Sequence, residues 1–395
     1  MTEERYLKPY IQDELNRRMV FLGGPRQVGK TTLTKQLLQS DSLHGVYYNW
    51  DNPSDRKRIR EDQWPGQAKL LVFDELHKFR HWKNWIKGLY DTHHDQFNIL
   101  VTGSAKLNLF RKQGDSLFGR YTYHSLHPFS YNEIATQGQQ KPLPYGSEHA
   151  PLEFTAHPSS SIIPLLDHFG GFPEPFLRQE ERFIRKWHQE RLALLVRGDI
   201  RDINTIQDLD NLEVLVRLLE SRVGSLFSTN ALREDIEVSF KSIKNWILLL
   251  ETIYYCYRIY PYHKNVARAL KKEPKLYLWD WSEVKNEGAR FENMIAGHLQ
   301  KFVCFLNEYE GYKIALHFVR NREGKELDFL ITWDQKPWFG VEVKLSSTTP
   351  DPNLSYFQNQ LAIPYCFQLV KQENVDISHN KIRIMSASKF LSALV

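Results

Sequence analysis

The sequence is poor in cysteine, has no long apolar run and carries little excess charge. Its three cysteines among 395 residues are widely separated, so neither a disulfide framework nor a zinc knuckle is available. The longest apolar stretch, residues 246–257, is interrupted by Glu251 and Thr252 and falls short of the roughly 18 residues that a membrane helix needs. Lys and Arg exceed Asp and Glu by 52 to 47, and a net charge of +5 neither requires nor excludes a nucleic-acid partner.

The start of the chain also lacks the features of an export signal. Residues 1–5 contain acidic side chains where a signal peptide has a basic start and an apolar core. Together with the scarce cysteines, this predicts a reduced, soluble, cytoplasmic protein with no membrane partner.

The composition is globular, with 42% hydrophobic and 25% charged residues. At roughly 150 residues per domain, the length corresponds to about 2.6 domains. The first 135 residues alternate short apolar runs with amphipathic helical stretches. The expected strands are Met19–Leu22, Val46–Trp50, Leu70–Phe73, Phe97–Thr102 and Tyr121–Ser125, and the expected helices are Lys30–Gln39, Trp82–His93 and Leu107–Lys112. This alternation predicts an α/β fold whose parallel sheet is covered on both faces.

The pattern changes beyond residue 136. A polar segment rich in proline and glycine, 137–146, predicts a loop or an exposed insertion. A helical pattern follows, then short helices with a wing, then one helix at 289–305 and three strands at 314–319, 326–332 and 339–345. We therefore expect an α/β domain at 1–150, a helical segment at 151–212, a winged-helix-like module at 213–275 and a second α/β domain at 276–395.

A phosphate-binding motif lies between the first expected strand and the first expected helix. The segment Gly24–Thr31 matches G-x-x-x-x-G-K-[ST] at every fixed position. Backbone N–H groups of such a loop close around phosphate oxygens at the N-terminus of the helix. We expect Lys30 to reach the β- and γ-phosphates and Thr31 to hold Mg²⁺. The residues expected to contact the nucleotide here are Gly24, Pro25, Arg26, Gln27, Val28, Gly29, Lys30, Thr31 and Thr32.

Two acids follow another apolar strand. Asp74 and Glu75 come directly after 70–73, at the strand end where ligands gather in open α/β sheets. We expect Asp74 to hold Mg²⁺ and Glu75 to polarise the attacking water. The pair favours hydrolysis over transfer of the phosphate to a substrate. The alternative is a surface pair that caps the next helix.

Further polar residues extend this expected site. Thr102 and Ser104 follow the next strand and suit a sensor of the γ-phosphate or water, although a simple strand-ending turn explains them equally well. Arg120 follows Leu117-Phe-Gly119, and an arginine offered to a neighbouring subunit can contribute about 10³–10⁵ in rate. A surface arginine with a structural role is the alternative.

The order of these motifs resembles that of the prokaryotic AAA-type ATPases that carry a C-terminal domain of unknown function. The resemblance covers nearly the whole chain. It is carried by Gly24–Leu33, Tyr47–Asp51, Phe73–His77 with Trp85, Val101–Ser104, Ser116–Arg120, His127–Ser130, Gly170–Glu174, Arg201–Asp202, Pro261–Asn265, Gly288–Asn293 and Glu326–Leu330.

The resemblance implies a P-loop AAA-type ATPase domain with a helical lid. Thr102 or Ser104 then becomes a sensor, and Arg120 becomes an arginine-finger candidate, which implies a homo-oligomer. Pro173, in Gly171-Phe-Pro173, looks like the element with which related ATPases close the lid on the nucleotide, and a loop between two lid helices is the plainer alternative. The choice of ATP over GTP rests on the resemblance alone.

A second candidate site lies in the last expected domain. Glu326 and Asp328 point to one side of their strand, and Glu342 and Lys344 do the same on the next, so carboxylates and a lysine gather on one face. Such a face can bind one or two Mg²⁺ ions, with Lys344 stabilising a pentavalent phosphate. Glu292, on the preceding helix, completes the set.

This second set resembles the PD-(D/E)XK nuclease core, in which Asp328, Glu342 and Lys344 match the signature residues. Leu327 stands where the family pattern has proline. The alternative is an amphipathic hairpin with solvated charges, and such folds also persist as binding domains that do not cut.

Basic residues are concentrated at 263–275, with five Lys or Arg side chains against one acid. Contact with DNA phosphates is one interpretation, with RNA not excluded, and a solvated or domain-docking face is the other. The sequence thus predicts an ATP- and Mg²⁺-dependent ATPase that acts on or with nucleic acid. The alternative is a nucleotide-controlled switch whose nuclease-like domain binds a partner without cleavage.

Overall fold

The computed structural model describes residues 4–39, 44–103, 117–138, 152–154, 159–194, 208–263, 265, 269–270 and 272–395. The chain divides into two compact units. The N-terminal unit runs to His127 and includes 137–138 and 252–254, and the C-terminal unit takes up the remainder. Ser104, the helix expected at 107–112, Arg201 with Asp202, and most of the 137–160 segment lie outside the described residues.

The N-terminal unit is built on a parallel sheet. Where this unit is described, five strands lie in the order β2-β3-β4-β1-β5, and every neighbouring pair is parallel. They are β1 (Met19–Gly23), β2 (Gly45–Asn49), β3 (Leu70–Asp74), β4 (Asn98–Thr102) and β5 (Tyr121–Ser125). β1 and β3 are buried along their whole length, as their apolar sequences predict for a sheet covered on both faces. The predicted α/β fold with a parallel sheet is confirmed.

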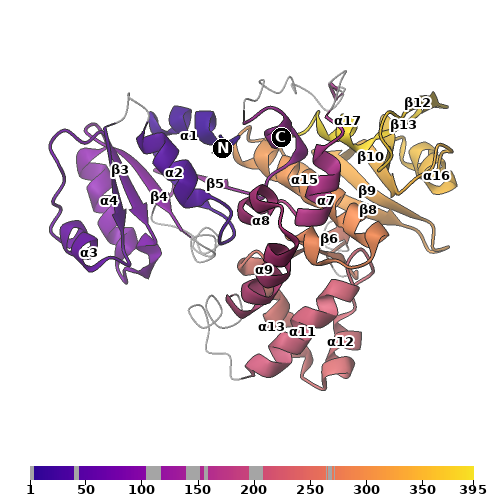
Figure 1. Ribbon diagram of the computed structural model, residues 1–395, viewed down its shortest axis with the longest axis horizontal. Coiled ribbons are helices and arrows are strands. Elements are labelled where there is room, and N and C mark those ends of the chain that lie inside the picture. The colour runs from indigo at the N-terminus through magenta and orange to yellow at the C-terminus, as the bar shows by residue number, and fades with distance from the viewer. Residues whose placement is uncertain are drawn as a thin grey trace. The chain divides into compact units, whose positions relative to one another are not determined.

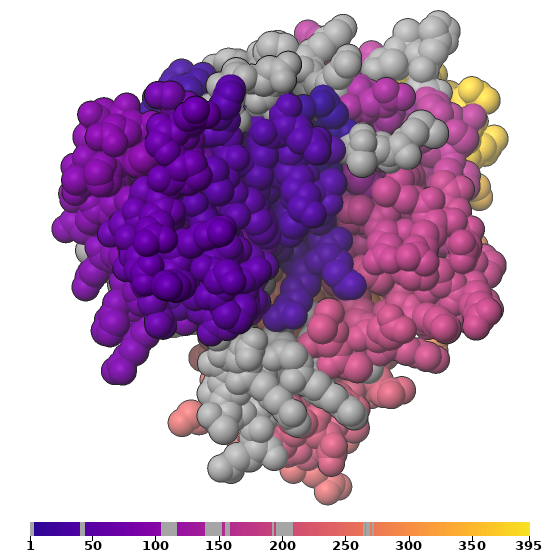
Figure 2. Space-filling model, turned by 60° about the vertical axis from the view of Figure 1, so that its left-hand side comes forward, coloured from indigo at the N-terminus to yellow at the C-terminus, as the bar shows by residue number. Residues whose placement is uncertain are grey.

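Helices cover both faces of this sheet (Figure 1). α1 (Lys8–Leu15) and α2 (Lys30–Leu38) lie on one face, and α4 (Trp82–His93) lies on the other. The apolar stripe of α4 packs with Phe21 and Phe73 in one core cluster. In the space-filling view, the elements of this unit form a continuous indigo-to-purple surface (Figure 2).

Two described helices of this unit, α1 and α3, were not expected from the apolar pattern. α3 (Pro53–Arg60) is polar except for the buried Ile59. It begins at Asn52, whose side chain accepts hydrogen bonds from the backbone N–H groups of Ser54 and Asp55, and it has proline in its first turn. Capping therefore sets its start, because hydrophobic periodicity is absent.

The C-terminal unit contains a second, mixed sheet. Its described strands lie in the order β12-β13-β11-β10-β9-β8-β6-β7. Strands β8, β9 and β10 are antiparallel neighbours, and β10 pairs with β11 in parallel. The strands are β6 (Cys256–Pro261), β7 (Lys275–Leu278), β8 (Ile314–Arg320), β9 (Glu326–Trp333), β10 (Lys336–Lys344), β11 (Tyr365–Val370), β12 (Asp376–His379) and β13 (Ile382–Ser386).

A long helix packs on this sheet. α15 (Glu287–Glu308) begins at Asn286, whose side chain accepts a hydrogen bond from the backbone N–H of Ala289. The connection from β10 to the parallel β11 is the crossover helix α16 (Pro352–Leu361), because parallel strands cannot be joined by a hairpin. The chain order is therefore α15–β8–β9–β10–α16–β11, and the short α17 (Ala387–Leu391) follows β13.

The other helices of this unit precede its sheet in the chain. They are α6 (Tyr131–Ala135), α7 (Ile162–Phe169), α8 (Pro173–Arg178), α9 (Glu181–Leu194), α11 (Leu209–Ser221), α12 (Thr229–Ile236) and α13 (Phe240–Thr252). Lys301 of α15 fixes the start of this run, because its buried ammonium binds Glu133 at 2.6 Å, Ser130 Oγ at 2.9 Å and the Pro128 carbonyl at 3.2 Å.

The hairpin expected to be a wing belongs to this sheet. β6 and β7 are antiparallel, but β6 also pairs in parallel with β8 through Tyr260 and Pro261. Most residues of the hairpin are buried. Pairing with β8 covers a strand edge of β6 that would otherwise be exposed. The hairpin is therefore the edge of the C-terminal sheet. Among the helices that the structure describes, none is long and apolar enough to cross a membrane.

Candidate functional site

The predicted phosphate loop joins β1 to α2. Gly24 has φ 141°, and a Cβ there would lie 2.4 Å from the Leu126 carbonyl oxygen, so no side chain fits. Gly29 has φ 97° and immediately precedes the first residue of α2, Lys30. Both fixed glycines of the motif thus occupy positions that other residues disfavour. The backbone N–H groups at the start of α2 are oriented to bind an anion.

The ammonium of Lys30 is held by the loop itself. Its Nζ donates to the carbonyl oxygens of Gly24 at 2.9 Å and Pro25 at 2.7 Å. Both acceptors are neutral, whereas a phosphate oxygen carries charge and forms a stronger hydrogen bond. Phosphate can therefore draw Lys30 away from these carbonyls.

An arginine far from the motif also braces this loop. The buried guanidinium of Arg5 donates to the carbonyl of Val28 within the loop and to the carbonyl of His127 at 2.6 Å. It thereby ties the loop to the chain beyond β5. Sequence reasoning missed Arg5, because no spacing pattern distinguishes a buried arginine near the N-terminus from a solvated one.

Asp74 lies at the carboxyl end of β3, among hydroxyl groups. It accepts hydrogen bonds from Thr102 Oγ1 at 2.5 Å and from the hydroxyl of Tyr47. Burial together with Asp74 raises the pKa of Tyr47, whereas its interaction with the Thr31 side chain lowers it. One hydroxyl thus joins the two residues expected to hold Mg²⁺. Tyr47 is a second residue that sequence reasoning missed, although it lies in a segment that carries the family resemblance.

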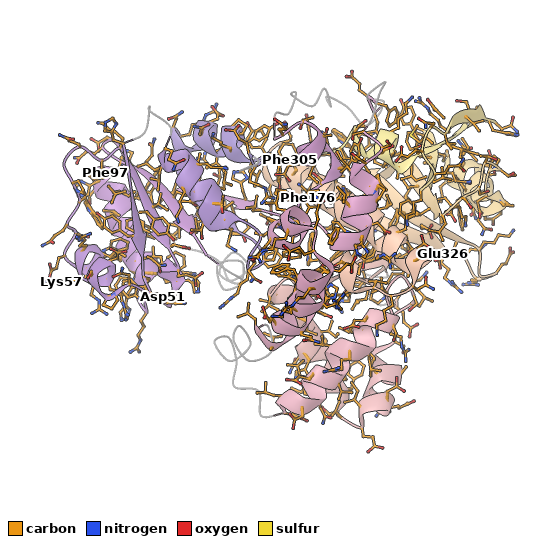
Figure 3. All side chains as sticks on the ribbon, viewed as in Figure 1. Asp51, Lys57, Phe97, Phe176, Phe305 and Glu326 are labelled. Atoms are coloured by element: carbon orange, nitrogen blue, oxygen red, sulfur yellow. The ribbon has the colours of Figure 1, made fainter. Side chains whose placement is uncertain are left out.

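Glu75 is held in an unusual backbone conformation. Its φ of 55° is left-handed, which non-glycine residues seldom adopt and which often marks functional sites. Burial raises the pKa of Glu75, Asp74 raises it further, and Lys78 and Lys30 lower it. Lys78 lies 3.4 Å from Glu75 Oε2 and 2.6 Å from the exposed Asp51, which Figure 3 labels. A partly desolvated carboxylate with a raised pKa is suited to accept a proton.

Of the other described residues predicted for this set, Thr102 lies in the site, whereas Arg120 and Pro173 lie outside it. Thr102 is buried against Asp74. Arg120 immediately precedes β5, at the edge of the parallel sheet opposite the phosphate loop, and forms a two-pronged pair with Asp91 at 2.6 and 3.1 Å. Pro173 is the first residue of α8 in the C-terminal unit.

The donor set at the phosphate loop fits a nucleotide with Mg²⁺. Neutral N–H groups and the Lys30 ammonium match phosphate oxygens, and the Thr31 hydroxyl with the Asp74 carboxylate matches a hard cation. Of the nine predicted contact residues, Gly24, Pro25 and Val28 are buried, whereas Gln27 in the loop and Thr31 and Thr32 at the first turn of α2 are exposed. When bound, Mg²⁺ neutralises charge that develops on the phosphates.

The second predicted set meets on neighbouring strands of the C-terminal sheet. The β9–β10 register, which pairs Phe329 with Val341, places Asp328 opposite Glu342. Asp328 Oδ2 accepts from the backbone N–H of Val343 at 2.9 Å, and Lys344 Nζ lies 2.8 Å from Glu342 Oε1. Burial raises the pKa of both Asp328 and Glu342. Glu292 and Glu326 complete what we call the carboxylate cluster, namely Glu292, Glu326, Asp328 and Glu342.

A buried lysine that was not assigned to this set lies within it. The Nζ of Lys275, at the start of β7, is 2.5 Å from Glu326 Oε1, 3.5 Å from Glu292 Oε1 and 3.9 Å from Asp328 Oδ1. Its side chain is only 3% exposed, and although burial lowers its pKa, the surrounding carboxylates raise it overall. Lys275 had been counted in the basic segment 263–275, but its burial removes it from any contact with nucleic-acid phosphates.

The carboxylate cluster does not fit a divalent metal ion. Within the described part of the chain, no three His, Cys, Asp or Glu side chains converge to hold one. The Lys275 ammonium lies among the three carboxylates instead. Adding a dication about 4 Å from this ammonium would cost about 8 kcal/mol in repulsion at an effective dielectric constant of about 20.

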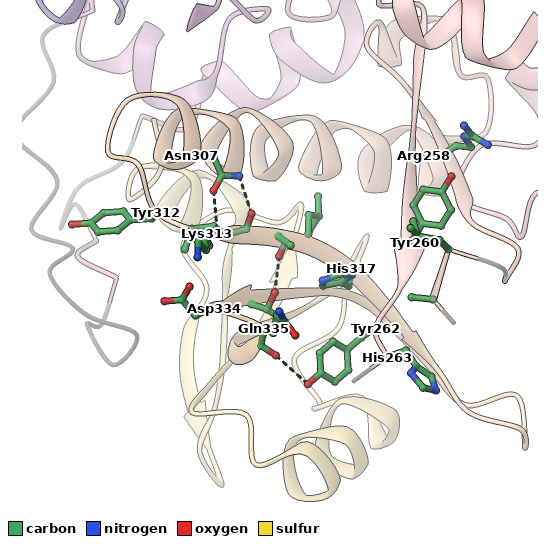
Figure 4. A pocket seen from close by; sticks show the side chains of 16 residues that line it. Arg258, Tyr260, Tyr262, His263, Asn307, Tyr312, Lys313, His317, Asp334 and Gln335 are labelled. Atoms are coloured by element: carbon green, nitrogen blue, oxygen red, sulfur yellow. Dashed lines mark hydrogen bonds between the residues drawn. The ribbon is translucent and has the colours of Figure 1, made fainter. Parts of the chain in front are cut away.

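A cavity of about 570 Å³ lies on the C-terminal sheet (Figure 4). Its walls come from β6, the end of α15, β8 and β9. Half-buried aromatic rings and cationic or titratable side chains line it together: Tyr260, Tyr262, Tyr312, His263, His317 and Lys313. The Tyr262 ring meets that of His317 edge-on, and its hydroxyl donates to the Gln335 carbonyl at 3.3 Å. Such a lining suits a planar, anionic ligand.

Comparison with known proteins finds uncharacterized relatives. One from Methanocaldococcus jannaschii is 24% identical over 74% of this chain and 65% of its own length. One from Mycobacterium tuberculosis is 21% identical over 84% of this chain and 71% of its own length. The chain thus spans about two thirds of the length of the first of these relatives.

Two of the solved structures that match are distant in sequence and in fold. The RuvB Holliday junction branch migration motor of Thermotoga maritima has a TM-score of 0.31 and 16% identity, covering 64% of this chain and 88% of that one. Caenorhabditis elegans PCH-2 has a TM-score of 0.24 and 15% identity, covering 63% and 66%. Likenesses of this extent transfer neither a partner nor a reaction to this chain.

Family models match three consecutive parts of the sequence. Residues 167–283 and 287–390 each match a domain of unknown function. Residues 16–135 match an AAA domain, and this range contains the parallel sheet, the phosphate loop and Asp74. The segment 16–135 is therefore similar to AAA domains and contains a P-loop.

Proposed function

We propose that the protein is a Mg²⁺-dependent ATPase whose nucleotide site is built by Lys30, Thr31, Asp74 and Glu75. One observation carries the proposal: the Tyr47 hydroxyl donates to Asp74 and interacts with the Thr31 side chain. The hydroxyl and the carboxylate that match Mg²⁺ therefore share one neighbouring oxygen atom. A hydroxyl bridge of this kind can yield to a hard cation, because both ends are oxygen ligands.

The proposed roles follow from the contacts of each residue. Lys30 exchanges its two carbonyl acceptors for phosphate oxygens, and Thr102 keeps Asp74 oriented through their hydrogen bond. Glu75 accepts a proton from the attacking water, because burial raises its pKa and so makes it a stronger base than an ordinary carboxylate. Arg5 keeps the loop in the shape that presents its N–H groups.

ATP turnover of the wild type and of Glu75→Gln tests the hydrolytic role. We expect Glu75→Gln to lose about 10²–10⁴-fold in turnover while still binding nucleotide. The matched control is Glu61→Gln, which makes the same change on the exposed end of α3. Equal rates in wild type and Glu75→Gln, or no turnover with Mg²⁺ in either, would disprove the proposal.

Arg120 supports a homo-oligomer that shares its active sites. Its position at the opposite edge of the sheet from the phosphate loop favours action on a neighbouring subunit. A mixing experiment tests this: Glu75→Gln subunits retain Arg120, and Arg120→Ala subunits retain Glu75. We expect each variant alone to be slow and the mixture to regain turnover. A mixture no faster than the average of its components would exclude a shared site.

We also propose that the C-terminal unit has a nuclease-like core and engages a nucleic-acid strand. The order α15–β8–β9–β10–α16–β11, with Asp328 and Glu342 on adjacent strands, supports the nuclease-like core. The tyrosine-lined cavity supports a strand whose bases stack on Tyr260 and Tyr262. Anisotropy of labelled single-stranded DNA and RNA measures this, and we expect Tyr260→Ala with Tyr262→Ala to weaken binding relative to Tyr356→Ala, which changes a half-buried tyrosine outside the cavity. Binding unaffected by both tyrosines would reject the cavity as the site.

A second candidate function is a nucleotide-controlled switch that binds its partner without cleavage. The position of Lys275 favours this candidate over a metal-dependent nuclease. A cleavage assay with Mg²⁺ or Mn²⁺ separates the two. Cleavage that is lost in Asp328→Ala would establish the nuclease and reject the switch.

A further inference from the structure

We propose that the Lys275 ammonium takes the place of a divalent metal ion in the carboxylate cluster, so that the C-terminal unit engages its partner without cutting it. The proposal deepens the second candidate function and rests on the proposed nuclease-like core. It is independent of the nucleotide site in the N-terminal unit.

The first argument is that every member of the carboxylate cluster already has a donor. Lys275 serves Glu292, Glu326 and Asp328. Each carboxylate also accepts from a further donor: Glu292 from the Tyr277 hydroxyl at 2.8 Å, Glu326 from Arg320 at 2.8 Å, Asp328 from the Val343 N–H at 2.9 Å and Glu342 from Lys344 at 2.8 Å. A metal ion would have to displace several of these donors at once.

The second argument is that Lys275 enters the cluster from a fixed backbone. It is the first residue of β7, and the register of the β6–β7 hairpin pairs it with Ile259. Its Nζ also lies 5.7 Å from the centroid of the Phe318 ring. Because the side chain is 3% exposed, the ammonium cannot leave the carboxylates for water without moving the strand or its neighbours.

The third argument concerns the space that a metal ion needs. Hard dications bind six or more oxygen atoms at about 2.0–2.6 Å, so a metal site must leave space for the ion between its ligands. Here the ammonium reaches within 2.5 Å of one carboxylate oxygen and within 3.9 Å of two others. The volume between Glu292, Glu326 and Asp328 is therefore filled by the lysine.

Binding of Mn²⁺ alone to the full chain, without nucleotide, tests the proposal. The titration is followed by the electron paramagnetic resonance signal of free Mn²⁺. It compares two pairs of proteins: the wild type with Asp328→Asn, and Lys275→Met with the double variant Lys275→Met/Asp328→Asn. We expect the wild-type pair to bind equally. We expect Lys275→Met to gain a site that is about tenfold or more tighter than any in the wild type and depends on Asp328, because removing the ammonium leaves three carboxylates without it.

Two lysine variants serve as controls. Lys275→Arg keeps a cation in the cluster and should gain no site. Lys301→Met removes another buried lysine of this unit, whose ammonium pairs with Glu133, and it should not respond to Mn²⁺. Thermal unfolding gives a second readout, because Mn²⁺ should raise the midpoint of Lys275→Met and leave Lys301→Met unchanged.

Two outcomes would overturn the proposal. Asp328-dependent Mn²⁺ binding by the wild type would show that the lysine gives way to a metal. A folded Lys275→Met that gains no site would show that the ammonium does not occupy a metal position. If Lys275→Met does not fold, the double variant Lys275→Met/Glu326→Gln replaces it, because it removes one of the uncompensated charges. The comparison of the wild type with Asp328→Asn still shows whether the wild type binds Mn²⁺ through Asp328. If the Mn²⁺ results are as expected but the protein binds no nucleic acid, only the proposed partner is rejected.

Discussion

Lys30 and Lys275 are both held by oxygen atoms, but the charge on those atoms differs. Lys30 donates to two neutral backbone carbonyls, whereas Lys275 lies among three carboxylates. An ammonium bound to neutral acceptors gains when an anion arrives, because charge-assisted hydrogen bonds are stronger. An ammonium already among carboxylates gains nothing comparable. The first arrangement is prepared for a ligand, and the second is complete without one.

The acids of the two regions differ in the same way. Asp74 is held by the hydroxyls of Tyr47 and Thr102, which carry no charge. Asp328 and Glu342 are held by backbone N–H groups and by lysines. A cation can replace a neutral hydroxyl as a partner, but it must repel or expel an ammonium. Matching residue types therefore predict chemistry only when the charge around them is known.

The largest expected effect is on stability and compares the two buried lysines. Lys301→Met should lower the free energy of unfolding by about 3–5 kcal/mol, because Glu133 is left buried without its cation. Lys275→Met should be comparably destabilised without metal but regain stability with Mn²⁺. Denaturant unfolding with and without Mn²⁺ measures both. An equal response of the two variants to Mn²⁺ would contradict the distinction.

Lys30 should affect turnover far more than Lys275. Lys30→Met removes a cation that meets phosphate and should lower ATP turnover by about 10²–10³-fold. Lys275→Arg should stay within about twofold of the wild type, because Lys275 is not among the residues proposed for the nucleotide site. Steady-state phosphate release provides the measurement. A large loss in Lys275→Arg would show that the two regions are coupled.

Tyr47→Phe tests whether the neutral hydroxyl competes with Mg²⁺. Removing it leaves Asp74 and Thr31 without their shared partner. The variant should reach half-maximal turnover at a Mg²⁺ concentration about three- to tenfold lower, since one hydrogen bond to a charged group no longer has to be broken. A Mg²⁺ titration of turnover is the assay. A higher Mg²⁺ requirement would place Tyr47 among the groups that support the bound cation.

The smallest expected effect is a shift in the pH profile. Turnover should fall as the pH drops through the pKa of Glu75, because the protonated acid cannot accept a proton. Lys78 lowers this pKa, so Lys78→Met should raise it and move the acidic limb of the profile to higher pH. Turnover between pH 5 and 8 measures the limb. A limb that moves to lower pH would exclude Glu75 as the titrating group.

Local signals in the sequence were sufficient for the N-terminal sheet. Apolar runs predict its five strands, and the glycines of the phosphate loop are predicted by their spacing alone. The short helices α1 and α3 were missed, and the start of α3 depends on the Asn52 cap and not on periodicity. The expected wing is a hairpin at the edge of the C-terminal sheet, because β6 pairs with a strand that begins more than 50 residues later.

Side chains that support the sites were harder to predict. Arg5 and Tyr47 act through contacts 23 and 27 residues away in the chain. Neither residue type nor spacing marks such contacts, because a solvated arginine or tyrosine has the same sequence context. Ser104 and its role as a sensor, and the roles of Thr102, Arg120 and Pro173, stay predictions.

By itself, the sequence determined the phosphate loop, because its chemistry is local: two glycines, a lysine and a threonine within eight residues bring their groups together through backbone geometry. It also determined that acids and Lys344 share one face of two strands, because side chains alternate. Only the tertiary structure decided what compensates those acids. Lys275 lies 51 residues before Glu326, and an ammonium that the sequence counts only as part of a basic segment becomes a buried counterion once β7 joins the sheet.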